Sequence, residues 1–287
     1  MKDYSEQFQE LKPLQQKHCE IIQYLDAFCT ENDIEWCLAF GSALGAKRHG
    51  GPIPWDDDAD VYMTAKGYEK FRRLFHEKGD KERFYLQEME SVDGMVYMPK
   101  LRMNGTTFIE ESLKDYDMHH GIYIDIFLLH ECPPTKWEKY KGIAATCYIT
   151  LKRLSNRNYK KRKAVRPLML FLRLFPKKFG FKTAYKQLYK WDDKPQKQLV
   201  DWELYTGNPK WFMDKDVILP PVRMDYDGHN FCVPHNVERY LEICYGEWQQ
   251  IPSIEKIHWA QHANNWSTTE DFHQRANNVH DYRDEQF

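Results

Sequence analysis

The sequence lacks several features that would assign it to a class at once. Its seven cysteines are scattered and none forms a C-x-x-C pair, so the pattern indicates neither a zinc ribbon nor a disulfide framework. No apolar run approaches the roughly 20 residues that a membrane-spanning helix needs. There is no internal repeat, and the formal net charge of −2 gives no global argument for nucleic-acid binding.

These absences predict a compartment. Scattered, unpaired cysteines suit a reducing environment. The polar start MKDYSEQFQELK does not resemble a signal peptide. We therefore expect a cytoplasmic protein, with or without peripheral contact with a membrane.

What is present supports one large, well-packed domain. Hydrophobic residues make up 42% of the 287 residues and aromatic residues 15%, which is ample for a core. We expect three segments within one continuous catalytic domain. Residues 1–135 would form a mixed core, 136–215 a basic helical lobe, and 216–287 a hairpin and helix that pack back on the core.

The stretch from Phe40 to Met63, FGSALGAKRHGGPIPWDDDADVYM, carries the strongest pattern. A Gly-Ser pair at Gly41 and Ser42 is followed by four aspartates, Asp56, Asp57, Asp58 and Asp60. Buried like charges repel, so such a cluster stays ionised only in water or around a cation. Hard cations such as Mg²⁺ take one or two carboxylates and fill their other positions with phosphate and water.

The flanks of the aspartates indicate a phosphate-binding turn. Residues 35–40 are mostly apolar and suit a buried strand. Gly41 permits a sharp turn, and Ser42 can cap the helix that follows. The free N–H groups at such a helix start form an anion site, and phosphate is the expected anion.

The alternation of polar and apolar residues then assigns the aspartates to different faces of one strand. Residues 58–63 read as a half-buried strand that puts Asp58 and Asp60 on one face. Asp57 would point to the other face and Asp56 would lie at the strand mouth, where both could orient the loop. Another β-rich run, residues 119–129, holds the single charge Asp125. Such a buried carboxylate must bind a metal or pair with a cation.

Two runs resemble a known family. These are Gly41-Ser42-Ala43-Leu44-Gly45-Ala46-Lys47-Arg48-His49 and Ile53-Pro54-Trp55-Asp56-Asp57-Asp58-Ala59-Asp60, with a later Asp125-Ile126-Phe127. They are similar to LicD family cholinephosphotransferases, which have the nucleotidyltransferase superfold and are related to fukutin-type phospho-alditol transferases. Ser42 departs from the family, which often has a second glycine there. The likeness extends from about residue 15 to 260.

The resemblance implies a fold and a set of roles. The fold would be α+β, with a mixed sheet flanked by helices. Asp58, Asp60 and Asp125 would be catalytic and bind Mg²⁺ or Mn²⁺, although Asp125 could instead pair with Lys100 or Arg102 or take the proton of the acceptor. Phosphate of the donor would contact Gly41 and Ser42, assisted by Arg48, Lys100 and Arg102.

The implied reaction moves phosphocholine from CDP-choline to a sugar hydroxyl of a teichoic acid, capsule or lipopolysaccharide precursor, and CMP leaves. Transfer of ribitol phosphate or glycerol phosphate from its CDP form is an alternative. NTP-dependent nucleotidyl transfer is another, and a non-catalytic glycan-binding or membrane-binding adaptor a third. Trp55 could stack on a base, line a choline cage by cation–π attraction, or pack in the core.

Residues 139–190 differ from the rest because they contain no acidic residue, while Lys and Arg recur. An apolar stripe bounded by cations runs from Arg166 to Lys178. This pattern is typical of a segment that rests on an anionic membrane face, which predicts contact of residues 152–182 with the inner membrane surface or with a lipid-linked glycan. A helical lobe with a solvated basic edge is the alternative.

Overall fold

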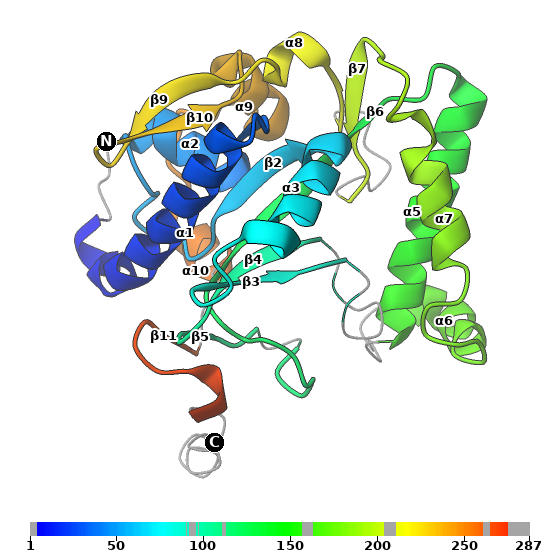
Figure 1. The fold of residues 1–287 in the computed structure, drawn as a ribbon, viewed down its shortest axis with the longest axis horizontal. Coiled ribbons are helices and arrows are strands. Elements are labelled where there is room, and N and C mark those ends of the chain that lie inside the picture. The colour runs from blue at the N-terminus through cyan, green and yellow to red at the C-terminus, as the bar shows by residue number, and fades with distance from the viewer. Residues whose placement is uncertain are drawn as a thin grey trace.

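The computed structural model describes residues 5–89, 91, 96, 98–110, 113–156, 163–203, 211–260 and 265–274. Helices and strands surround one central mixed sheet, and a group of helices stands to one side of it (Figure 1). The predicted α+β class with a nucleotidyltransferase-like core is therefore confirmed.

The central sheet has seven strands. Five follow the spatial order β1-β2-β6-β4-β3, and β7 and β8 extend from β6. β2 and β6 are parallel and the other pairs are antiparallel. The strands are Trp36–Leu38 (β1), Asp60–Thr64 (β2), Phe84–Gln87 (β3), Lys100–Met103 (β4), Tyr123–Glu131 (β6), Gln198–Asp201 (β7) and Phe212–Asp214 (β8).

β6 changes partner along one edge. Its first residues pair with β4 and its last with β7, while β2 lies along the opposite edge. Between the two partners, the N–H of Leu128 donates to Oε2 of Glu203 at 3.3 Å. A carboxylate thus occupies a position where a strand would otherwise pair.

Two long helices cover the sheet. The N-terminal helical segment consists of η1 (Ser5–Leu11) and α1 (Lys12–Glu31), and α3 (Ala65–Lys78) follows β2. Their apolar side chains recur at helical spacing and pack against β6 and neighbouring strands.

A second group of elements surrounds the start of β2. It comprises α2 (Phe40–His49), the hairpin of β9 (Val222–Tyr226) and β10 (His229–Val233), and α9 (Val237–Tyr245). The hairpin predicted within residues 216–287 is present, and its turn is formed by Asp227 and Gly228, which both have positive φ, 54° and 78°. Shorter elements are β5 (Thr107–Phe108), which pairs with β11 (Trp266–Ser267), α8 (Lys215–Ile218) and α10 (Ile254–Ala260).

The helical lobe consists of α5 (Lys136–Asn156), α6 (Arg166–Leu172) and α7 (Phe181–Leu188), with short turns η2 (Lys163–Val165) and η3 (Tyr189–Trp191). It has a small core of its own that includes Ile149, Phe181 and Trp202. β7 and β8, which fall in the same predicted segment 136–215, pair with the central sheet. Within the described ranges, no helix is both long and apolar enough to cross a bilayer.

Candidate functional site

Three charged residues lie in a row across adjacent strands. Asp60 of β2 is in register with Asp125 of β6, and Asp125 is in register with Lys100 of β4. Residues in register on neighbouring strands point to the same face of the sheet. Nζ of Lys100 contacts Oδ1 of Asp125 at 2.6 Å. The two aspartates from separate segments therefore meet, as the sequence led us to expect.

Residues 56 to 60 alternate between partly exposed and buried positions. Asp56, Asp58 and Asp60 are partly exposed, whereas Asp57 and Ala59 between them are buried. The side chain of Asp58 lies close enough to that of Asp56 to raise the pKa of Asp56. Asp56 was expected only at the strand mouth, yet it lies with Asp58, Asp60 and Asp125, and these four residues form the acid cluster. Its spacing of two from Asp58 was the signal in the sequence that could have placed it there.

The cluster is electrostatically strained. Burial, together with Asp58 and Asp125, raises the pKa of Asp60 well above its ordinary value, and Lys100 only partly opposes this. Burial and the neighbouring aspartates raise the pKa of Asp56 in the same way, against Arg48. Burial also raises the pKa of Asp125, although Lys100 counteracts it strongly. Bound protons or added cations must therefore neutralise part of the negative charge of these carboxylates.

These residues can accommodate a hard cation if a phosphate takes part. Within the described part of the chain, no three acidic, histidine or cysteine side chains are arranged to hold one metal ion. The ammonium of Lys100 contacts Asp125. Mg²⁺ needs only one or two carboxylates, however, and completes its shell with phosphate and water. Asp58 and Asp60 supply that number.

The helix that follows the Gly-Ser pair begins earlier than predicted. Ala39 is the N-cap of α2 and provides no side-chain cap, so the expectation that Ser42 caps the helix is wrong. Ser42 lies in the first turn, where its buried hydroxyl accepts the N–H of Asp60 at 2.9 Å. This bond ties α2 to β2, because a hydroxyl facing the neighbouring strand finds a donor there.

The first turn of α2 opens on the acid cluster. N–H groups in a first turn have no acceptor within the helix, and those of Gly41 and Ser42 belong to this class. Phe40 has a positive φ of 39°, and its N–H donates to Oη of Tyr240 at 3.0 Å. A Cβ on Gly41 would lie 2.5 Å from Oδ2 of Asp56, so helix and cluster are in direct contact.

Lys100 and Arg102 have different environments. Both cations lie over the ring of Tyr123, at 3.6 and 4.6 Å from its centroid. Arg102 is fully buried, and it donates to Oε1 of Gln87 at 2.6 Å and to the carbonyl of Gly121 at 2.9 Å. Its contacts fix the sheet, whereas Lys100 faces the aspartates.

Arg48 connects α2 to the chain after α9. Nη1 donates to the carbonyls of Trp248 and Gln250 at 2.8 and 3.2 Å, and Nε donates to His49 at 2.9 Å. These bonds suit a positioning residue that also adds positive charge near Asp56.

Trp55 is buried, with an exposed fraction of 9%, and packs against rings of Phe8 and His49. Of the roles left open for it, core packing has this support.

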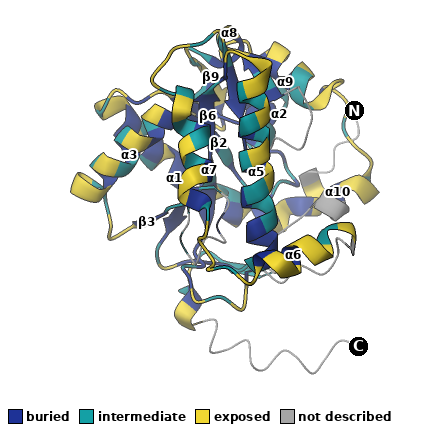
Figure 2. Cartoon of the chain, turned by 90° about the vertical axis from the view of Figure 1, so that its right-hand side faces the viewer, coloured by how far each residue is buried: buried dark blue, intermediate teal, exposed yellow. Residues whose placement is uncertain are grey.

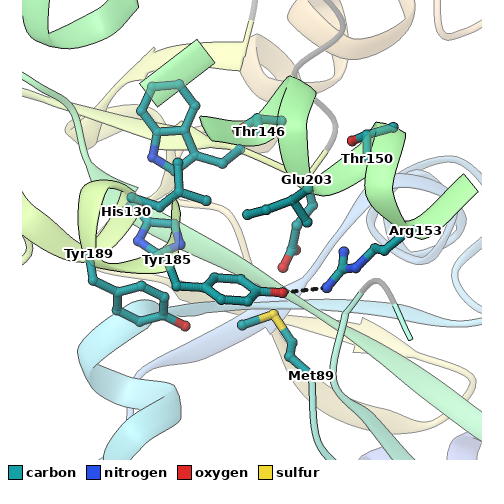
Figure 3. A pocket seen from close by; sticks show the side chains of 11 residues that line it. Met89, His130, Thr146, Thr150, Arg153, Tyr185, Tyr189 and Glu203 are labelled. Carbon is teal, nitrogen blue, oxygen red and sulfur yellow. Dashed lines mark hydrogen bonds between the residues drawn. The ribbon is translucent and has the colours of Figure 1, made fainter. Parts of the chain in front are cut away.

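A pocket lined by both polar and apolar side chains lies between the lobe and the sheet (Figure 3). Nη2 of Arg153 donates to the hydroxyl of Tyr185 at 2.5 Å, and the carboxylate of Glu203 lies on the same side of the guanidinium as that hydroxyl. Burial and Asp201 raise the pKa of Glu203, Arg153 opposes this, and Asp125 contributes. No pattern in the sequence indicates this pocket, since Arg153 is one cation among many in its segment.

The chain is similar to known proteins in the region that contains this site. Residues 33–141 match the family model described as LicD/FKTN/FKRP, nucleotidyltransferase domain. That range contains Gly41, the aspartates, Lys100 and Asp125. The chain is also similar to the lipopolysaccharide cholinephosphotransferase LicD of Haemophilus influenzae, with 26% identity over 260 residues, which is 85% of this chain and 93% of that protein.

Proposed function

The chain is a member of the LicD/FKTN/FKRP family and a phosphotransferase, and from this premise we propose that it transfers phosphocholine from CDP-choline to a sugar hydroxyl of a lipopolysaccharide glycan. The name of the Haemophilus influenzae relative supports the donated group and the acceptor class. The observation that carries the proposal is the register that aligns Asp60, Asp125 and Lys100 beside the first turn of α2.

The proposed reaction is a substitution at phosphorus. The oxygen of the acceptor hydroxyl forms a bond to the phosphorus of phosphocholine, and the bond from that phosphorus to the oxygen of CMP breaks. CMP leaves with the electron pair of the broken bond, and the acceptor hydroxyl loses its proton. When bound, Mg²⁺ or Mn²⁺ supplies positive charge at the phosphate oxygens.

We assign the residues as follows. Asp58 and Asp60 hold the divalent ion, and Asp125 takes the acceptor proton. The amides of Gly41 and Ser42 bind phosphate of the donor at the helix start. Lys100 neutralises phosphate charge, while Arg102 and Arg48 hold the surrounding framework.

The test is release of CMP by the purified protein. It is incubated with Mg²⁺, a lipopolysaccharide oligosaccharide acceptor, and CDP-choline, CDP-ribitol or CDP-glycerol in parallel. We expect CDP-choline to be preferred. Asp58→Asn and Asp60→Asn should each lower turnover at least about a hundredfold, equivalent to about 2.7 kcal/mol or more in the barrier. The matched control is Asp193→Asn, whose carboxylate is 90% exposed on the surface.

Other outcomes would redirect the assignment. Preference for CDP-ribitol or CDP-glycerol would retain the site and change the donor. Pyrophosphate release from an NTP would indicate nucleotidyl transfer. Turnover undiminished in both Asn variants, with circular dichroism spectra unchanged, would reject the site.

A further inference from the structure

The end of the helical lobe exposes a group of large apolar side chains. We call α6 and the turn after it, residues 166–179, the tip. Its five outward-facing side chains are 44% to 79% exposed: Leu168, Leu170, Phe171, Leu174 and Phe179. Within α6 only Met169 and Leu172 are buried. Figure 2 shows α6 exposed over most of its length, and such an apolar group on a surface marks an interaction site.

The tip has a defined conformation. The ammonium of Lys152 on α5 is fully buried and donates to the carbonyls of Leu172 and Phe175 at 2.7 and 3.0 Å. The hydroxyl of Ser155 donates to the carbonyl of Met169 at 2.6 Å. Burying an ammonium is costly unless its hydrogen bonds are made. Hydrogen bonds from α5 therefore hold the backbone of the tip in place, and the apolar side chains of the tip point to the solvent.

Cations accompany the apolar side chains. Five exposed basic residues belong to the tip or adjoin it: Arg166, Arg173, Lys177, Lys178 and Lys182. The whole segment 139–190 contains no acidic residue. A groove of about 810 Å³ between α5 and α7 begins at Phe179 and has Ala144, Ala145 and Tyr148 along its walls. Apolar surface thus continues from the tip into the lobe.

We propose that the tip docks on a membrane surface that contains anionic phospholipids. The apolar side chains would enter the boundary between headgroups and acyl chains, and the cations would contact lipid phosphates. Charge decides between this occupant and a second copy of the chain. Two tips placed face to face would bring like charges together, whereas an anionic bilayer complements them.

Vesicle flotation of the full-length protein tests the proposal. Vesicles of phosphatidylcholine alone are compared with vesicles that also contain phosphatidylglycerol, at low and high salt. We expect binding only to the anionic vesicles, and weaker binding at high salt. The double variant Phe171→Ser, Leu174→Ser should bind at least about tenfold more weakly. The matched control is Trp137→Ser, Tyr140→Ser, which removes side chains that are 68% and 61% exposed near the other end of α5.

Each remaining outcome has a definite meaning. Absence of wild-type binding to anionic vesicles, or equal binding by the tip and control variants, would overturn the proposal. A wild-type dimer in sedimentation velocity that the tip variant dissociates, without vesicle binding, would assign the patch to self-association instead. The flotation assay contains no donor substrate, so its result is separate from CMP release. With a water-soluble acceptor, the tip variant should release CMP at the wild-type rate.

Discussion

At the scale of single residues, the tightest constraint in the site is between Gly41 and Asp56. Any Cβ at position 41 would meet the carboxylate of Asp56 at 2.5 Å. Only the end of a flexible side chain is in the way, so the carboxylate can move aside while the backbone stays in place. Gly41 therefore determines where Asp56 lies relative to the other acids.

We predict that Gly41→Ala lowers the rate of CMP release at least about tenfold, because the acid cluster is displaced, while the free energy of unfolding changes by less than about 1 kcal/mol. Gly45→Ala is the contrasting variant. Its Cβ would lie 2.5 Å from the carbonyl oxygen of Gly51, which is backbone, so it should destabilise the protein by about 1–3 kcal/mol. CMP release and urea unfolding are measured for both. Full activity in Gly41→Ala would contradict the prediction that a Cβ at position 41 displaces the acid cluster.

At the scale of elements, α1 illustrates how a polar residue is used on an apolar face. His18 lies on the buried stripe of the helix with Leu14, Ile21 and Ile22, and its exposed fraction is 4%. Burial lowers the pKa of His18 to about 3. The neutral imidazole thus serves as a core side chain, and its protonation is incompatible with the packed helix.

This burial predicts a pH dependence of stability. Between about pH 6.5 and pH 3 the unfolded chain protonates His18 but the folded chain does not, so the free energy of unfolding falls as pH decreases. From pH 7 to pH 5 this residue should account for a loss of about 2 kcal/mol. We expect His18→Leu to remove that part of the pH dependence. Urea unfolding at the two pH values measures it.

The control for this prediction is His235→Leu, because His235 is exposed. Its pH dependence should match that of the wild type. If His18→Leu also lost stability on acidification as steeply as the wild type, the burial argument would be wrong.

At the scale of the whole molecule, the helical lobe packs closely against the chain at the end of β7. α5 approaches β7 at Gly142, where a Cβ would overlap the indole of Trp202. Trp202 is 1% exposed, and the next residue is Glu203, whose carboxylate accepts the N–H of Leu128. The fit of the lobe therefore positions the chain that fills the gap between β4 and β7.

We predict that Gly142→Ala destabilises the protein by about 1–3 kcal/mol, because the rigid indole must shift or the lobe must move away from the sheet. The measurements are the urea unfolding midpoint and the tryptophan fluorescence of the folded state. Ala144→Val, on the exposed side of the same helical turn, should leave both almost unchanged. Equal stability of Gly142→Ala and wild type would show that the lobe adapts to the added methyl group.

The sequence by itself determined the local parts of this protein. The period of apolar residues located α1 and α3, and the Asp-Gly pair located the turn between β9 and β10. The Gly-Ser pair and the alternating aspartates located one strand of the candidate site. All of these features depend on neighbours within a few residues, so they can be predicted from short patterns in the sequence.

Only the tertiary structure decided how these parts meet. The register of β2, β6 and β4 placed Asp60, Asp125 and Lys100 in one row, and the packing of the sheet buried the side chain of Arg102 completely. It also turned Ser42 from a cap into an acceptor for β2. Strand register and side-chain burial depend on partners far along the chain, and a shift of one residue would turn each strand over.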